Sequence, residues 1–410
     1  MFDSATITHL RSTIEEHFPD ALRLLEQLVN IGSHSLDPEG VNRVGEMLWT
    51  EFEKLGFVEG VMQSTDPRCG KHLLLNKPGT GHTALLLVGH LDTVYTNEDL
   101  EEDAFRWRKD GDRIFGPGTV DDKGGNVMIW LLLKALLQAD PEFFHSVHWQ
   151  VHFNAAEELL GVDFAEASVR SLHPRTKAAL VFEYGPNQGK EWKILTGRKG
   201  RAQFEVQVEG KAAHAGHPEL GANAIRQLSE LIPQIEDLTD LARGLTANVG
   251  IIHGGEASNS VPHFAEATAE VRATRQEVLE EAVEKILGLE GTGNIKAAET
   301  GFACKIRVNL LEKMDAWDPA NPESQNLLSV WQVAGEKLGL EVDRYERGGL
   351  SDGNYLAAQG IPTLDGLGPD GANLHSSRND PEAGHEPEYV RVDTFAEKTL
   401  LNAIAIRMLV

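Results

Sequence analysis

Four short apolar runs in the first half of the chain restrict its fold more than any other feature. They are HLLLN at 72–76, ALLLVGHL at 84–91, HWQVHFN at 148–154 and AALVFE at 178–183. Residues that favour turns bound each run, and a helical pattern over 127–139 separates the second run from the third. Strands that are apolar at consecutive positions belong to a mainly parallel sheet buried on both faces. We therefore predict an α/β fold.

Helical signals precede and follow these runs. Asp37 and Pro38 suit the N-cap and the first position of a helix, and Gly56 suits its end. The apolar residues between them recur on one helical face: Val41, Val44, Leu48, Phe52 and Leu55. Helices over 323–338 and 391–409 continue the α/β pattern near the end of the chain.

The pattern changes between residues 196 and 314. Strand AQFEVQVEG, helix NAIRQLSELIPQI, strands NVGIIHGG and AEATAEVRAT, helix EVLEEAVEKILGL and strand CKIRVNL follow one another. This βαββαβ order is ferredoxin-like. We expect an inserted domain over 196–314, which divides the α/β domain into parts at 1–195 and 315–410.

Composition argues against several classes of function. The 410 residues include 63 acidic and 38 basic side chains, for a formal net charge of −25. A nucleic-acid-binding protein needs a basic surface, and an anionic membrane would repel this chain, so we expect neither partner. The most apolar helical stretch, at 127–137, is much shorter than the roughly 18 residues of a membrane span.

The cysteines and the N-terminal stretch indicate a cytoplasmic protein. Cys69 and Cys304 are the only cysteines, and they form neither a disulfide framework nor a CxxC pair. The stretch MFDSATITHLRSTIEEHF lacks the basic and apolar regions of a secretory signal. Any metal ion would therefore be bound by histidines and carboxylates.

Histidine and acidic residues gather where the apolar runs end, which is where sites form in open α/β sheets. The clusters are His90 with Asp92, Asp121 with Asp122, Glu157 with Glu158, and Glu183. Each cluster alone has an ordinary explanation as a strand end, a turn or the first turn of a helix. Together, so many carboxylates would repel one another unless one or two divalent cations lay between them.

A series of motifs in a fixed order gives a more specific indication. GHLDTV, GPGTVDDKGG, NAAEELLG, FEYG, GKAAHAGHPELGANAI, ASNSVPHFAEATAEVR and LGPDGANLHS span nearly the whole chain. They resemble the dinuclear zinc family that contains bacterial glutamate carboxypeptidase, acetylornithine deacetylase and succinyl-diaminopimelate desuccinylase. The resemblance implies a zinc-peptidase catalytic domain with an inserted lid and dimerisation domain.

The resemblance also implies two Zn²⁺ ions per subunit, with Co²⁺ or Mn²⁺ as possible substitutes. His90 and Glu183 would hold one ion, Glu158 and His375 the other, and Asp121 would bridge both. Three protein ligands per ion leave a position open for water, as in catalytic zinc sites.

Further roles follow from the same resemblance. Asp92 would orient the ring of His90. Glu157 would be the general base, which takes a proton from the metal-bound water and passes it to the leaving amine. The peptide bond between Asp121 and Asp122 would be cis.

The last ligand departs from the family pattern, in which a His-Ser or His-Thr pair stands shortly before Glu-Tyr-Val. Here His375 stands 13 positions before Glu388, and a second candidate, His385, lies between them. We favour His375 because LGPDGANL before it matches the family. His385 follows a polar stretch that is typical of a surface insertion over 376–387.

Four residues are candidates for substrate recognition. Arg272 matches the arginine that grips a substrate carboxylate in the family, although it could also be an ordinary surface arginine. Asn259 and the backbone around Gly349 match assisting positions. His214 matches a residue that stabilises the tetrahedral oxyanion from a partner subunit, although it could instead cap its own turn.

We therefore expect a zinc-dependent amide hydrolase that cleaves a small peptide or N-acyl amino acid next to a free carboxylate. A carboxypeptidase is the first hypothesis and an N-acyl-amino-acid deacylase the second. A non-catalytic metal or metabolite binder is the alternative from another class, and Glu157 argues against it. The strand NVGIIHGG and the helix at 222–235 are expected to form a homodimer through the lid.

Overall fold

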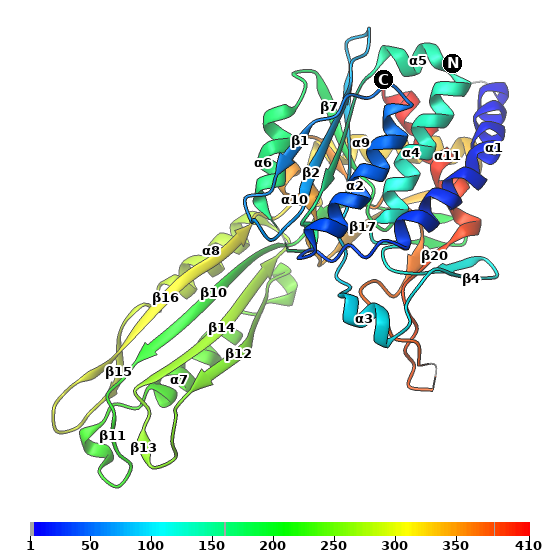
Figure 1. Ribbon diagram of the computed structural model, residues 1–410. Coiled ribbons are helices and arrows are strands. Elements are labelled where there is room, and N and C mark those ends of the chain that lie inside the picture. Colours follow the sequence, from blue (N-terminus) through cyan, green and yellow to red (C-terminus); the bar gives the residue numbers. More distant parts are fainter. Residues whose placement is uncertain (1–3, 160, 381) are drawn as a thin grey trace. The chain divides into compact units, whose positions relative to one another are not determined.

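The computed structural model describes residues 4–159, 161–380 and 382–410, which form two compact units (Figure 1). The first unit comprises Met1–Thr196, Ala320–Glu346 and Ser351–Val410, and the second comprises Gly197–Pro319 and Arg347–Leu350. Leu160 of the AAEELLG motif and Pro381 of the 376–387 insertion lie outside the described residues. Within the described ranges, no helix has the length and apolar character needed to cross a membrane.

A six-stranded sheet with the order β1-β2-β6-β3-β7-β18 forms the centre of the first unit. Its strands are β1 Val61–Gln63, β2 Lys71–Lys77, β3 Ala84–His90, β6 His148–Asn154, β7 Thr176–Val181 and β18 Thr363–Leu364. Strands β6, β3, β7 and β18 are parallel neighbours, whereas β1 and β2 pair antiparallel. The prediction of a mainly parallel sheet is confirmed.

Both faces of this sheet are covered, which explains why β3 is apolar at consecutive positions. All seven residues of β3 are buried. Leu85 and Leu87 belong to the large hydrophobic cluster of this unit, whereas Leu86 and Val88 belong to a smaller cluster with Phe164. Alternate residues of one strand point to opposite faces, so two separate cores hold β3 between them.

Helices cover these two faces. The helices of this unit are α1 Ser4–Val29, α2 Pro38–Glu53, α3 Asn97–Glu102, α4 Lys123–Ala139, α5 Pro141–Ser146, α6 Val162–Ser171, α9 Pro322–Leu338, α10 Asp352–Ala358 and α11 Val392–Leu409, and all except α3 lie around the sheet (Figure 1). Helix α4 packs against β3, α1 and α11, while α10 packs against α6 and β7. Helix α2 begins where predicted, because the Asp37 side chain accepts a hydrogen bond from the N–H of Gly40.

Helix α4 begins at Lys123, earlier than the predicted start at 127. Its first turn contains Gly124 and Gly125, which in a sequence suggest a turn rather than a helix. A Cβ atom on Gly125 would lie 2.1 Å from the carbonyl oxygen of Phe182. Glycine therefore lets the start of α4 approach the end of β7, and this approach brings Asp121 close to the sheet.

Two smaller sheets have the orders β19-β20-β5-β4 and β17-β9-β8. Their strands are β4 Arg108–Asp110, β5 Arg113–Phe115, β8 Asn187–Gln188, β9 Glu191–Arg198, β17 Glu341–Arg347, β19 Gly371–Ala372 and β20 Tyr389–Arg391.

The second unit contains a five-stranded antiparallel sheet with the order β12-β14-β10-β16-β15. Its elements are β10 Gly200–Glu209, β11 Ala213–His214, α7 Ala224–Glu236, β12 Thr246–Gly254, β13 Ser260–Val261, β14 Phe264–Ala273, α8 Gln276–Leu287, β15 Gly291–Lys296 and β16 Ala303–Met314. Helices α7 and α8 pack against the sheet. Without the extra edge strand β15, the strand order is that of a ferredoxin-like fold, as predicted.

Candidate metal centre

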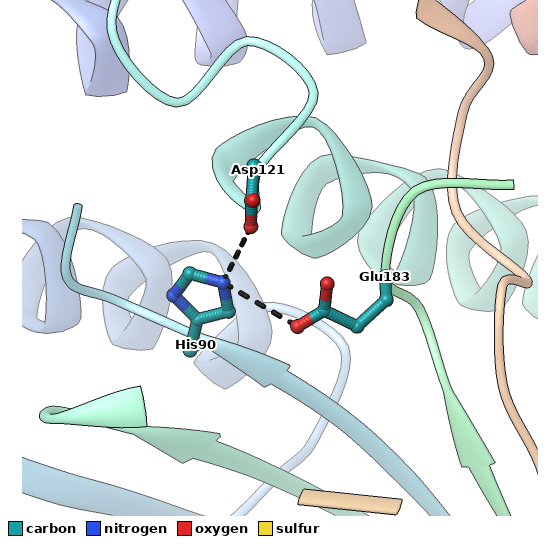
Figure 2. Close-up of side chains that lie close together, drawn as sticks. All are labelled: His90, Asp121 and Glu183. Atoms are coloured by element: carbon teal, nitrogen blue, oxygen red, sulfur yellow. Dashed lines mark hydrogen bonds and ion pairs between the residues drawn. The ribbon is translucent and has the colours of Figure 1, made fainter. Parts of the chain in front are cut away.

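The imidazole of His90, the last residue of β3, lies between two buried carboxylates. Its Nε2 atom is 2.9 Å from Oδ1 of Asp121 and 3.5 Å from Oε1 of Glu183 (Figure 2). Asp121 stands just before α4 and Glu183 just after β7, so three segments supply these side chains. The facing atoms are one nitrogen and two oxygens, which are donors that zinc accepts in proteins.

A second group of side chains shares Asp121. Nε2 of His375 lies 3.3 Å from Oδ2 of Asp121 and 3.3 Å from Oε2 of Glu158. Within each group, the candidate ligand atoms lie within 4.8 Å of one another. Asp121 thus presents one carboxylate oxygen to each group, as a residue that bridges two cations would do. These five side chains are the ones that the resemblance implies as ligands.

The alternative ligand, His385, lies elsewhere. It is exposed, and its backbone pairs with that of Asp380 through hydrogen bonds of 2.8 and 2.9 Å. Neither candidate metal-binding group found in the described part of the chain includes it. His375, by contrast, has a left-handed backbone with φ of 64°. Such a conformation is uncommon for a residue other than glycine and is concentrated at functional sites. The geometry therefore favours His375.

The backbone around Asp121 joins the loop before α4 to the end of β3. The peptide bond between Asp121 and Asp122 is cis, which confirms what the resemblance implies. Oδ2 of Asp122 accepts a hydrogen bond of 3.1 Å from the N–H of His90, and the side-chain amide of Asn126 donates to the His90 carbonyl oxygen. Both polar groups of the His90 backbone are therefore held by residues of one loop and helix.

The charges in this centre are unbalanced toward the negative. Hydrogen bonds that His375 donates to the carboxylates of Asp121 and Glu158 raise the pKa of His375 to about 10. Burial, together with the charge of Glu183, raises the pKa of Glu157 well above its ordinary value. Burial and the charge of Asp121 raise the pKa of Glu158. Both glutamates are therefore difficult to ionise when only protein groups supply positive charge. A divalent cation would reduce the repulsion among the neighbouring carboxylates.

Asp92 connects the His90 imidazole to the turn after β6. Its fully buried carboxylate accepts hydrogen bonds from the N–H groups of Glu157 and Glu158, at 3.1 and 3.2 Å, and from Oγ of Ser35 at 2.6 Å. One of its oxygens also lies 3.3 Å from Nδ1 of His90, and its backbone oxygen lies 3.0 Å from the same atom. An Nδ1–H that donates to Asp92 directs Nε2 toward the other carboxylates.

Glu388, the glutamate of the Glu-Tyr-Val pattern, supports Asp121. It is completely buried, and its Oε1 accepts hydrogen bonds from the N–H groups of Val120, at 2.8 Å, and of Asp121, at 3.2 Å. Its Oε2 accepts a bond of 2.6 Å from the hydroxyl of Tyr95. Burial raises the pKa of Glu388 to about 7. The sequence does not reveal this role, because the backbone groups that donate to Glu388 lie more than 200 positions away.

Among the candidates for substrate recognition, His214 and Asn259 lie together in the second unit. His214 of β11 pairs with Ser260 of β13, and the carbonyl oxygen of Asn259 accepts a bond of 2.9 Å from the N–H of Ala215. Nδ1 of His214 accepts a bond of 3.0 Å from the N–H of Gly216. The imidazole therefore does cap its own turn, and this contact occupies only one of its two nitrogens.

The other two candidates, Arg272 and Gly349, also belong to the second unit. The guanidinium of Arg272 donates to Oε1 of Glu270 at 2.8 Å and to the carbonyl oxygen of Gly348 at 3.2 Å. The carbonyl oxygen of Gly349 accepts a bond of 3.2 Å from Arg198. A substrate carboxylate at Arg272 would have to share this guanidinium with Glu270.

Comparison with known proteins finds peptidases and a deacetylase that are similar to this chain. A family model described as a peptidase dimerisation domain matches residues 196–289. Carboxypeptidase G2 of Pseudomonas sp. strain RS-16 is 32% identical over 88% of this chain and 84% of its own length. Acetylornithine deacetylase of Vibrio parahaemolyticus is 28% identical over 62% of this chain and 68% of its own length. The crystal structure of a tripeptidase from Staphylococcus aureus has the same fold, with a TM-score of 0.76 at 21% identity, over 96% of this chain and 98% of its own.

The contacts of Glu388 lead to a prediction about stability. Glu388→Leu leaves the buried N–H groups of Val120 and Asp121 without an acceptor, and each such loss costs roughly 1–3 kcal/mol. Urea unfolding of the metal-free protein should therefore show a free energy of unfolding lowered by about 2 kcal/mol or more. Glu388→Gln keeps an acceptor oxygen and should change the stability much less. Equal stabilities of the two variants would contradict this role.

Proposed function

This chain belongs to the M20 family of peptidases, and on that premise we propose that it is a zinc-dependent amide hydrolase of the cytoplasm. The proposed substrate is a small peptide or N-acyl amino acid with a free carboxylate next to the cleaved bond. Carboxypeptidase activity is the first assignment, and N-acyl-amino-acid deacylase activity is the second. The buried, unpaired thiols of Cys69 and Cys304 agree with a reducing compartment.

One observation carries this proposal: Asp121 faces His90 with one carboxylate oxygen and His375 with the other. We assign His90, Asp121 and Glu183 to one zinc ion, and Asp121, Glu158 and His375 to a second. Imidazole and carboxylate donors suit zinc, with cobalt or manganese as substitutes. When bound, the two cations would polarise the substrate carbonyl and lower the pKa of water.

Glu157 is the residue to which we assign proton transfer. It lies beside the ligand Glu158 but belongs to neither candidate ligand group in the described part of the chain. Its side chain is buried, and burial together with the charge of Glu183 raises its pKa well above the ordinary value. A carboxyl group whose pKa is raised toward neutral pH can accept a proton and return it to the leaving amine.

The role of Glu157 can be tested with its neutral isostere. Glu157→Gln should lower kcat by about 10²- to 10⁴-fold, the range for loss of a general acid–base group, while zinc content stays at the wild-type level.

Chelation of the wild-type enzyme should abolish hydrolysis, and zinc or cobalt should restore it. Amine release from dipeptides, N-acyl glutamates and N-acetyl or N-succinyl amino acids would measure the activity. A wild-type protein that binds two zinc ions and hydrolyses none of these compounds would favour the non-catalytic binder.

The assignment of the last ligand leads to a second test. His375→Ala should reduce the zinc content from two ions per chain toward one, because it removes the only imidazole of its group. His385→Ala is the matched control and should retain both ions, since His385 lies in an exposed hairpin. Metal analysis after dialysis measures both. Loss of zinc in His385→Ala together with its retention in His375→Ala would refute the assignment.

We further propose that the enzyme is a homodimer formed through its second unit. The edge strand β12 exposes Ile251 and Ile252, whose exposed fractions are 52% and 54%. Unpaired edges and exposed apolar side chains are features of surfaces that pair with another copy.

The placement of the candidate substrate residues within the second unit supports this dimer. His214 belongs to β11, which Figure 1 shows beside β13 at one end of the sheet, whereas Arg272 lies near the other end of β14. The eight positions from Phe264 to Arg272 span roughly 26 Å at the rise of a β-strand. A small substrate cannot reach both side chains of one subunit. The two side chains therefore cannot both contact one substrate from the same subunit, and we propose, as the resemblance implies, that His214 serves the site of the partner.

Mixed dimers test this assignment. His214→Ala and Glu157→Gln should each have little activity alone. In a hybrid of the two, one site has an intact Glu157 and receives an intact His214 from its partner, so refolding the mixture should restore up to half of the activity per hybrid dimer. Native mass spectrometry would verify that hybrids form. Hybrids as inactive as their parents would show that His214 does not act across the interface.

A further inference from the structure

The turn that follows β6 is held almost entirely by side chains. The backbone N–H groups of residues 155–158 each donate to a side-chain acceptor. Asp92 accepts the last two, and Asn154 accepts the second at 2.9 Å. The first, that of Ala155, donates to Nδ1 of His72 at 3.1 Å. This turn carries the proposed base and a proposed zinc ligand, so its position matters for the chemistry.

His72 belongs to β2, beside β6, and is completely buried. Burial lowers its pKa, so the imidazole is neutral at physiological pH and carries one proton. Because Nδ1 accepts the hydrogen bond from Ala155, the proton must be on Nε2. Nε2 lies 3.3 Å from Oδ2 of Asp163, and although this contact lacks the angle of a hydrogen bond, the carboxylate charge favours a proton on the facing nitrogen.

Asp163 is itself fixed by several donors. Its Oδ2 accepts hydrogen bonds from the N–H of Thr65 at 2.6 Å and from Oγ of Ser64 at 2.9 Å. Although burial acts in the opposite direction, the bond from Thr65, the nearby His72 and the bond from Ser64 hold the pKa of Asp163 at about 2. The carboxylate is thus ionised at neutral pH, and it selects the tautomer in which Nε2 of His72 carries the proton.

We propose that His72 is a positioning residue for the reaction proposed above: by accepting the N–H of Ala155, it holds the turn that places Glu157. Asp163 in turn holds His72 in the tautomer that can accept this bond. The inference rests on the proposed function of Glu157. It assigns to His72 no contact with substrate or metal.

The energetic reason is the cost of an unpaired backbone group. Ala155 is completely buried, so its N–H has no access to water if the imidazole nitrogen is removed. An unpaired buried N–H is unfavourable, and the turn can regain a partner for it only by moving. A shift of about 1 Å in a catalytic group can reduce the rate by about 100-fold. Loss of the Nδ1 acceptor should therefore affect turnover more than substrate binding.

Two amide substitutions separate the contacts of His72. His72→Asn places an oxygen near the position of Nδ1, so it can still accept the N–H of Ala155 but cannot reach Asp163. His72→Gln places its amide near the position of Nε2, so it can reach Asp163 but offers Ala155 no acceptor. Both variants put a similar polar group into the same buried space. His152→Gln is the control for a lost buried imidazole, since His152 is equally buried on β6 and contacts Ser168 instead of the turn.

The expected kinetic result is a difference between the two amides. In the zinc-loaded enzyme, His72→Gln should lower kcat by about 10- to 100-fold, as is typical for residues that orient groups at a metal site, with little change in KM. His72→Asn should retain kcat within about threefold, because the bond to Ala155 is kept, and His152→Gln should behave like the wild type. Equal values of kcat for His72→Asn and His72→Gln would overturn the inference.

Hydrogen–deuterium exchange gives a readout that does not depend on activity. A peptide that includes residues 155–158 should exchange faster in His72→Gln than in the wild type, and His72→Asn should remain protected. Unchanged exchange in His72→Gln would also overturn the inference. A wild-type enzyme that hydrolyses no substrate would instead refute the proposed function, while the exchange result would still decide whether His72 holds the turn.

Discussion

The candidate centre depends on the carboxylate of Asp121, which faces two imidazoles from distant parts of the chain. One oxygen faces His90 at the end of β3, and the other faces His375, which lies 285 positions after His90 in the sequence. Segments that are distant in the sequence must fold together before both imidazoles can face Asp121. The centre is therefore a product of the tertiary fold, and each residue that fixes the backbone of Asp121 also fixes both groups of candidate ligands.

The fold creates this arrangement through parallel strands that end at one edge. In the pairing of β3 with β6, His90 lies opposite Asn154, so the turn that carries Glu157 begins beside the imidazole. The end of β7 delivers Glu183 to the same edge. Helix α4 then brings Asp121 close because glycines at its start allow a near approach to the backbone of Phe182. Burial of the sheet on both faces supplies the rigidity that such a centre needs.

The sequence predicts the parts of this structure that leave a local signal. Consecutive apolar residues predict β3, and the carboxylates that follow such runs indicate a cation site. Helix α1 is not predicted above, although buried Leu10, Ile14 and Leu25 follow a helical spacing, because Pro19 interrupts the pattern. The domain limits and the roles of the site residues stay predictions.

The roles of His72 and Glu388 could not be predicted from the sequence, for a physical reason. Each acts by accepting hydrogen bonds from the backbone, and a backbone N–H is present at nearly every residue. Glu388 belongs to the Glu-Tyr-Val pattern, but its partner Val120 lies 268 positions away, and Ala155 lies 83 positions from His72. Only the assembled fold shows that these buried side chains hold segments of the candidate centre.

Asp92 supports both the candidate metal ligands and the proposed base. Asp92 contacts the imidazole of His90 and also accepts the N–H groups of Glu157 and Glu158. Two candidate metal ligands and the proposed base therefore share one supporting carboxylate. Such coupling keeps the distance between a bound cation and the base constant, which general base catalysis requires, because proton transfer depends on contact within hydrogen-bond range. The side chains around the turn after β6 thus act as one rigid assembly, built from elements that lie far apart in the chain.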